Sequence, residues 1–195
     1  MEKVNAMTLN SSLSRRQFIK STGLAVATTC LSSPLSCASE PAERQLKLYN
    51  THTGEWFKDV YSIKGKLLPE SVKQLNHLLR DWRSNEQISI DPRLFDLLHE
   101  TQKNFGTAMP CEIISAYRCP KTNSMLRAQG NRVAKNSFHL NGQAIDFYIP
   151  KARLIDVRNF LYTQNAKGVG YYPSAGFVHI DVGHRPHLKN KQGRW

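Results

Sequence analysis

The chain has 195 residues, of which 40% are hydrophobic and 22% are charged, and its formal net charge at pH 7 is +12. This composition excludes fibrous and wholly disordered proteins, and the length suits one domain with a hydrophobic core once a targeting segment is removed. The positive charge favours an anionic polymer as partner, such as nucleic acid, a membrane surface or a cell wall rich in carboxylates, but it also fits a role in solubility alone.

Residues 1–38 have the layout of a secretory signal. A basic stretch contains Arg15-Arg16, a short apolar stretch follows, and small residues end the segment at Ser36-Cys37-Ala38. The paired arginines resemble the twin-arginine signal, which predicts export to the periplasm through the twin-arginine machinery. Because the apolar stretch is too short and too polar for a bilayer, we expect no stable membrane span in the mature protein. Cys37 leaves lipidation as an alternative, although the residues before it match a lipobox poorly.

A polar lead-in is expected at 39–45, and one domain at 46–195. Two short β-rich runs, 46–49 and 56–61, flank Thr53-Gly54 and predict a β-hairpin. Apolar residues at helical spacing then predict a helix over 69–82.

A second helix is expected to begin with Asp91 as N-cap and Pro92 in the first turn, and to stop at Gly106. The remaining expected elements are a strand at 112–117, a helix at 122–129, a strand at 143–149, a helix at 152–164, and strands at 168–172 and 177–182. This order predicts an α+β fold in which helices pack on a mostly antiparallel sheet that carries the functional site.

Two cysteines, Cys111 and Cys119, remain after the signal segment is removed. An extended run between them would separate them by roughly 26 Å, which is far beyond disulfide reach. We expect no disulfide bond between them, and no CxxC pattern predicts a thiolate metal site.

The stretch from Ser137 to Asp146 contains the most informative residues. A turn at Asn141-Gly142 that feeds a strand would bring His139 and Asp146 toward one point. An unpaired buried carboxylate is costly, so Asp146 among apolar neighbours implies a nearby cation or several donors.

A second candidate segment, 177–182, alternates apolar and polar residues. With a period of two, His179 and Asp181 share one face of a strand. Two histidines and one carboxylate, with a fourth position free for water, are the ligands expected of a catalytic Zn²⁺ ion. Such an ion would activate water and polarise a substrate carbonyl.

These segments carry a resemblance to a known family. Ser137-x-His139-x-x-Gly142-x-Ala144-x-Asp146 matches the SxHxxGxAxD motif of the zinc D-alanyl-D-alanine peptidases related to the VanX dipeptidase. Ser115-Ala116-Tyr117-Arg118 resembles that family's S-G-Y-R segment, and Phe177 to Asp181 resembles its closing strand. The similarity extends from about residue 46 to residue 195 and is greatest to the twin-arginine-exported murein endopeptidases.

The resemblance implies that His139, Asp146 and His179 hold one Zn²⁺ ion. It implies that Arg118 binds substrate and stabilises its developing charge, whereas an ordinary salt bridge is the alternative role. Ser137 would orient His139 or bind substrate, or it would make only a local turn hydrogen bond.

The general base is the point at which this sequence departs from the better-known pattern of the family. VanX-type enzymes have a glutamate three residues before the last histidine, and this chain has Gly176 there. Asp181 is the nearest carboxylate and is expected either to act as the catalytic base or to orient His179. His184 and His187, in what looks like an exposed turn, are further candidates. Three other histidines are expected to be structural: His52, His77 and His99.

The implied function is zinc-dependent hydrolysis of peptide crosslinks in peptidoglycan. Only the resemblance favours endopeptidase over carboxypeptidase action, and it does not choose between a D,D and an L,D cut. A peptidoglycan-binding protein that keeps the metal fold without hydrolysis is the alternative, supported by the missing glutamate. Nucleic-acid binding fits the charge but lacks a motif and conflicts with export, so no nucleic-acid partner is expected.

Overall fold

The computed structural model describes residues 42–106, 108–130, 133–188 and 191–195. The expected signal segment at 1–38 and the start of the expected lead-in lie outside these residues. No helix in the described ranges is both long enough and apolar enough to cross a lipid bilayer.

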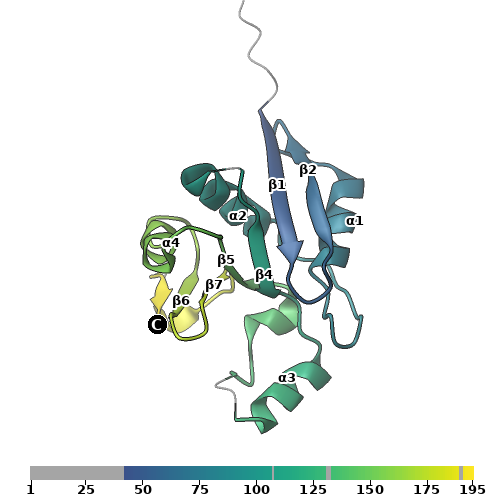
Figure 1. Ribbon diagram of the computed structural model, residues 1–195. Helices are drawn as coiled ribbons and strands as arrows, with labels where there is room; N and C mark the ends of the chain where they lie inside the picture. Colours follow the sequence, from purple (N-terminus) through teal and green to yellow (C-terminus); the bar gives the residue numbers. More distant parts are fainter. Residues whose placement is uncertain (1–41, 107, 131–132, 189–190) are drawn as a thin grey trace, which may run out of the picture. The chain divides into compact units, whose positions relative to one another are not determined.

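An eight-stranded sheet forms the centre of the described domain, with the order β3-β2-β1-β4-β5-β7-β6-β8 (Figure 1). The strands are β1 (Glu43–Asn50), β2 (Trp56–Ile63), β3 (Lys66–Leu67), β4 (Cys111–Ser115), β5 (Ala144–Tyr148), β6 (Gly168–Tyr172), β7 (Phe177–Asp181) and β8 (Gly193–Arg194). The β1/β4 and β6/β8 pairs are parallel, and the other neighbouring strands are antiparallel. The predicted α+β class and mostly antiparallel sheet are therefore confirmed.

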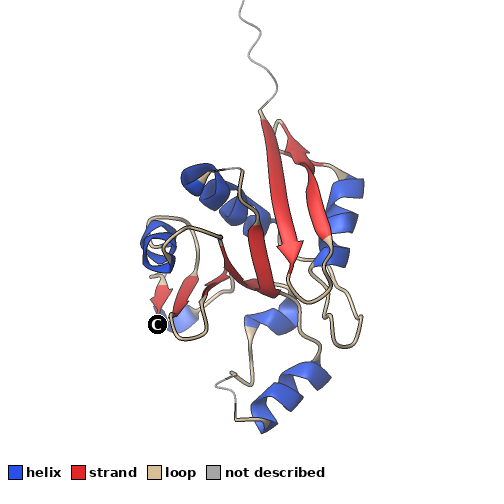
Figure 2. Ribbon diagram, viewed as in Figure 1, coloured by secondary structure: helices blue, strands red, loops and turns tan. Residues whose placement is uncertain are grey.

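The described residues form four α-helices, and three of them pack on this sheet (Figure 2). The helices are α1 (Pro69–Leu78), α2 (Pro92–Phe105), α3 (Pro120–Ala128) and α4 (Leu154–Leu161), with short 3-10 helices at η1 (Phe138–Asn141) and η2 (Pro186–Leu188). Helix α1 contacts β2, α2 contacts β1, and α4 contacts β6 and β7, whereas α3 lies beyond the end of β4 (Figure 1). The site described below lies on the α3 side of the sheet.

The predicted hairpin and second helix are confirmed. Strands β1 and β2 pair in antiparallel register, with Tyr49 opposite Trp56. Helix α2 begins as expected, because the Asp91 side chain accepts a hydrogen bond from the backbone N–H of Arg93, and Gly106 ends the helix. Strand β1 begins at Glu43, inside the segment expected as a lead-in.

Some boundaries differ from the prediction. Helix α1 ends at Leu78 rather than at residue 82. The carbonyl of Leu78 accepts a hydrogen bond from the side chain of Asn50, and the chain then turns, with the backbone N–H of Asn85 donating to the carbonyl of Asp81. Helix α4 is shorter than 152–164 at both ends, and the two-residue strands β3 and β8 were missed because they are too short for a period. Both Cys111 and Cys119 are buried free thiols, so the prediction that they are not bonded to each other is confirmed.

Gly142 is held in place where η1 turns into β5. Its φ angle is +63°, and a Cβ atom there would lie 2.8 Å from the backbone oxygen of Ser89. Its carbonyl also accepts a hydrogen bond from the backbone N–H of Asp91. The motif therefore has glycine here for two reasons, a left-handed backbone and a close approach between segments.

We expect Gly142→Ala to lower the free energy of unfolding by about 2–4 kcal/mol, because the methyl group adds backbone strain and a clash with Ser89. Gly54→Ala is the matched control, since Gly54 has a φ of +73° but open space around it. It should lose only about 1 kcal/mol. Urea unfolding measures both values, and equal losses would contradict the role given to the Ser89 contact.

Candidate metal centre and active site

The pairing of β5 with β7 brings two of the predicted ligands together. Asp146 on β5 lies directly opposite His179 on β7, and Ala144 lies opposite Asp181. Directly opposed residues of an antiparallel pair project from the same face of the sheet, so the carboxylate and the imidazole meet. The intervening Ile180 is fully buried on the other face, as the alternating pattern predicted.

The third predicted ligand, His139, comes from η1. The hydroxyl oxygen of Ser137 accepts a hydrogen bond from the backbone N–H of His139 at 3.4 Å and caps this short helix. The Nδ1 atom of His139 lies 2.6 Å from the carbonyl oxygen of Ala116. Because a carbonyl only accepts, the proton belongs on Nδ1, and Nε2 presents its lone pair toward Asp146 and His179.

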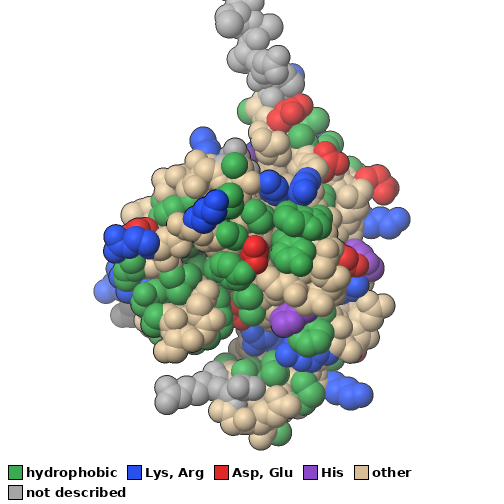
Figure 3. Space-filling model, in the orientation of Figure 1, with side chains coloured by type: hydrophobic (Ala, Val, Ile, Leu, Met, Phe, Trp, Pro, Cys, Tyr) green, Lys and Arg blue, Asp and Glu red, His purple; other side chains and the backbone are tan. Residues whose placement is uncertain are grey.

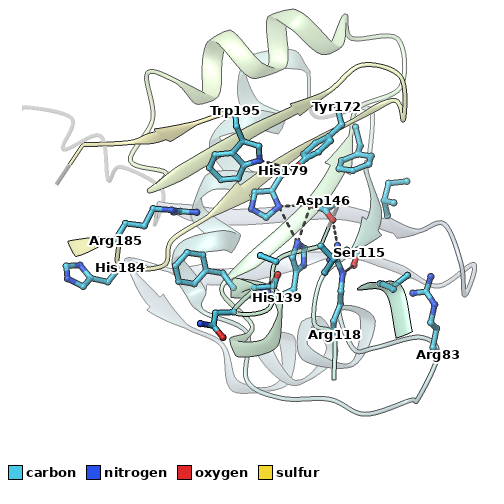
Figure 4. A pocket seen from close by; sticks show the side chains of 18 of the residues that line it. Arg83, Ser115, Arg118, His139, Asp146, Tyr172, His179, His184, Arg185 and Trp195 are labelled. Atoms are coloured by element: carbon cyan, nitrogen blue, oxygen red, sulfur yellow. Dashed lines mark hydrogen bonds and ion pairs between the residues drawn. The ribbon is translucent and has the colours of Figure 1, made fainter. Parts of the chain in front are cut away.

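Three donor atoms converge from these segments (Figure 4). His139 Nε2 lies 3.2 Å from His179 Nδ1 and 3.3 Å from Asp146 Oδ1, and His179 Nδ1 lies 2.7 Å from the same oxygen. Ligands at the usual zinc distances in a tetrahedron are about 3.3 Å apart. Two of the three separations match this value, so the residues present fit a Zn²⁺ ion with one coordination position left over.

The protonation of the three side chains suits a cation. Burial lowers the pKa of His139, which favours the neutral ring. Burial alone would raise the pKa of Asp146, but the charges and hydrogen bonds of His139 and His179 hold it well below its usual value. Burial would also lower the pKa of His179, but hydrogen bonds to Asp146 and Asp181 outweigh it and raise the pKa to about 9. With this raised pKa, His179 carries a proton at neutral pH when no metal is bound, and a bound metal ion would take the place of that proton.

Arg118 lies beside this cluster at the end of β4. Its Nε donates to the Ser115 hydroxyl at 2.8 Å, and its Nη2 donates to Asp146 Oδ2 at 2.5 Å. The structure therefore shows the ion pair that was the alternative role for Arg118. Nη1 has no hydrogen-bond partner among the described residues, so one N–H edge of the guanidinium remains for a substrate oxygen.

Asp181 lies on the other side of the His179 ring from Asp146. Its Oδ2 is 3.3 Å from His179 Nε2, and both of its oxygens accept hydrogen bonds from Arg185, at 2.5 and 2.6 Å. The carboxylate is fully buried. This position and these partners suit a residue that orients His179, because the carboxylate faces away from the three converging donor atoms.

Two glycines of β6 make room for these contacts. A Cβ atom at Gly168 would lie 2.2 Å from Asp181 Oδ2, and one at Gly170 would lie 2.6 Å from the indole nitrogen of Trp195. Trp195 donates a hydrogen bond from that nitrogen to the Tyr172 hydroxyl, and its ring centroid is 5.4 Å from that of His179. Gly170 thus leaves room for Trp195 and Tyr172 beside His179, and Gly168 leaves room for Asp181 and its partner Arg185.

A cleft of about 1080 Å³ opens over the cluster. Figure 4 shows its two ends, with Arg83 at one and His184 and Arg185 at the other. Asp146 is the sole acidic side chain among the residues that line it. In Figure 3, a histidine and Lys or Arg side chains gather between the sheet and α3.

The structure also places the other candidates. Ser137 lines the cleft, as do the exposed His184 and His187, the latter on η2. Gly176, the position at which the VanX-type pattern led us to look for a glutamate, lies in the β6/β7 turn with a φ of +77°, and a Cβ there would meet only open space.

Sequence reasoning missed several residues that line the cleft. His52, which was expected to be structural, lines the cleft, and its ring stacks on Trp82. Arg83, Arg185, Tyr172 and Trp195 were not singled out, because no motif marks them. His77 and His99 do not line this cleft.

A cluster of two histidines and one carboxylate at the floor of an open cleft, with a coordination position to spare, defines a candidate catalytic metal centre. Comparison with known proteins agrees with this class. A peptidase M15 family model described as "Peptidoglycan L,D-endopeptidase MepK" matches residues 38–187. The chain belongs to this family of peptidases.

Individual relatives carry the same description. The chain is 42% identical over 174 residues to the peptidoglycan L,D-endopeptidase MepK of Escherichia coli strain K12, a match that covers 89% of this chain and 96% of the relative. It is 37% identical over 171 residues to the probable peptidoglycan L,D-endopeptidase MepK of Haemophilus influenzae, covering 87% of this chain and 92% of that relative. No solved structure matches the chain significantly.

Proposed function

We propose that this chain is a zinc-dependent endopeptidase that hydrolyses peptide crosslinks in peptidoglycan, with an L,D rather than a D,D cut. The names of the relatives support the substrate and the type of bond. The convergence of His139 Nε2, Asp146 Oδ1 and His179 Nδ1 beneath an open cleft is the observation that carries the metal dependence.

In this proposal His139, Asp146 and His179 hold one Zn²⁺ ion. The ion, when bound, supplies a Lewis acid that polarises the scissile carbonyl and makes water a stronger nucleophile. The surrounding residues fix the ligand geometry, since Ala116 holds the tautomer of His139, Arg118 holds the outer oxygen of Asp146, and Asp181 holds the far nitrogen of His179.

Arg118 has a second proposed role at the substrate. Its guanidinium is fixed by Ser115 and Asp146, and its remaining N–H edge is available to a carbonyl oxygen that gains negative charge during hydrolysis. Ser137, which already caps η1, presents the same hydroxyl at the cleft wall, where it can bind a peptide group.

For Asp181, burial and the pair with Arg185 favour the orienting role over that of the general base. We expect Asp181→Asn to weaken zinc affinity about 10- to 100-fold, because the His179 ring loses its anionic partner. At saturating zinc, kcat should remain within a few fold of wild type. Competition with a chelator measures the affinity, and peptide cleavage measures kcat.

Asp156→Asn, on the exposed surface of α4, is the matched control. An Asp181→Asn variant that binds zinc normally but loses about a thousandfold in kcat would instead identify Asp181 as the general base.

We further propose that residues 1–38 are a twin-arginine signal peptide and that the mature peptidase domain acts in the periplasm. The basic, apolar and small-residue segments of the sequence support this assignment. Peptidoglycan, after which the relatives are named, lies outside the cytoplasm, and this agrees with export.

Purified protein incubated with defined crosslinked muropeptides tests the function. We expect products from peptides whose crosslink joins two diaminopimelate residues, loss of products with EDTA, and recovery with zinc. Cleavage of the crosslink between D-alanine and diaminopimelate alone would contradict the L,D assignment. Retention on peptidoglycan with no released fragment would support the non-hydrolytic alternative.

A further inference from the structure

We propose that Arg83 forms a carboxylate-binding subsite at one end of the active-site cleft and recognises a free carboxylate of the crosslinked peptide. This inference rests on the proposed function and adds a residue that selects the substrate. It follows from the way Arg83 is held and from the absence of an acidic partner in the described part of the chain.

Arg83 is anchored at both its backbone and its side chain. Its backbone N–H donates to the buried carboxylate of Asp81 at 3.0 Å. Its guanidinium carbon lies 4.0 Å from the centroid of the Trp82 ring, and the His52 ring stacks on Trp82 at 4.1 Å. A guanidinium placed over an indole ring loses little freedom when it binds an anion, so Arg83 is prepared for a ligand.

The other two arginines of the cleft differ from Arg83 in their partners. Arg118 pairs with Asp146, and Arg185 pairs with Asp181. No carboxylate of the described residues lies within ion-pair distance of the Arg83 guanidinium. Since the one acidic side chain that lines the cleft is already held by Arg118, the positive charge of Arg83 is available to a substrate group.

The site is arranged for an anion rather than for a neutral group. Arg83 is exposed, but partial burial still lowers the pKa of its guanidinium; the negative charge of Asp81 opposes this shift and the positive charge of Arg118 adds to it, so the guanidinium groups of Arg83 and Arg118 repel each other. A carboxylate placed at Arg83 relieves this repulsion and accepts two parallel hydrogen bonds from one guanidinium. A crosslink between two diaminopimelate residues leaves carboxylates beside the amide that is cut, so the proposed substrate carries this group near its scissile bond.

The test uses two synthetic crosslinked peptides, one with free diaminopimelate carboxylates and one with these groups converted to primary amides. We expect Arg83→Gln to raise KM for the free carboxylate peptide about tenfold and to leave KM for the amidated peptide unchanged. Arg83→Lys keeps the charge but loses the planar fork, and it should give an intermediate KM. Arg153→Gln, which removes an exposed arginine outside the cleft, should change neither value.

Equal losses on both peptides, or no loss on either, would overturn the subsite, and thermal melting would identify a loss that comes from misfolding. Wild-type protein that cleaves neither peptide would overturn the proposed function itself. The two failures are therefore distinguishable, because the subsite is judged only from the ratio of KM values between peptides that the wild-type protein cleaves.

Discussion

His139→Ala is expected to remove both the bound metal and the peptidase activity. The substitution removes one of the three donor atoms, so that only Asp146 and His179 remain to bind an ion. A catalytic metal supplies several kcal/mol of transition-state stabilisation, so kcat/KM should fall about a thousandfold or more. Metal analysis of the purified protein should give about one zinc per chain for wild type and almost none for the variant.

His77→Ala is the matched control for this experiment. His77 is a surface histidine on α1 that pairs with Glu55 and does not line the cleft. Its removal should change neither the metal content nor the activity. A His139→Ala protein that keeps one zinc and normal turnover would refute the assignment of the metal centre.

Arg118→Lys is expected to lower kcat by about 10²- to 10³-fold while the charge is retained. Lysine cannot reproduce the fork that contacts Ser115 and Asp146 and still present an N–H edge to substrate. Because Asp146 also loses a partner, zinc affinity should weaken, so kcat must be measured at saturating zinc.

Ser115→Ala separates the two roles of Arg118. It removes one hydrogen bond that orients the guanidinium and leaves the pair with Asp146 intact. We expect a smaller loss of kcat with unchanged zinc affinity. If Arg118→Lys affects only zinc affinity and restores full kcat once zinc is saturating, Arg118 acts only as a support for Asp146.

The candidate metal donors could be predicted from sequence because local patterns determine them. Period-two alternation assigns His179 and Asp181 to one strand face, and the glycine turn before Asp146 returns the chain toward His139. What the sequence did not contain was the pairing of β5 with β7, which places Asp146 opposite His179. Strand register between segments more than thirty residues apart depends on tertiary packing rather than on local pattern.

Residues that act through stacking or through distant partners could not be predicted. In the sequence, Trp82 and Arg83 are simply adjacent residues at the end of a predicted helix, and nothing indicates that the guanidinium lies over the ring. The pair of Asp181 with Arg185 spans four residues in a segment without helical pattern. Neither has a spacing rule, since both depend on where the loops fold over the cleft.

The fold was easier to predict at long elements than at short ones. Capping residues and a long apolar stripe fix α2 almost to the residue. The predicted end of α1 was wrong. The helix ends at Leu78, whose carbonyl accepts a hydrogen bond from Asn50, and Asn50 belongs to a strand nineteen residues before Pro69. The helix propensity of residues 79–82 carries no information about that contact.

Gly168 and Gly170 show that part of this active site consists of space left by absent side chains. Neither residue contributes a side chain to the cluster, yet a single methyl group at either would collide with the groups beside His179. In a library of single substitutions, these two positions should therefore tolerate as few replacements as the metal donors themselves. Intolerance to substitution at these positions of β6 would then reflect the volume of the added side chain rather than the loss of a catalytic or ligand group.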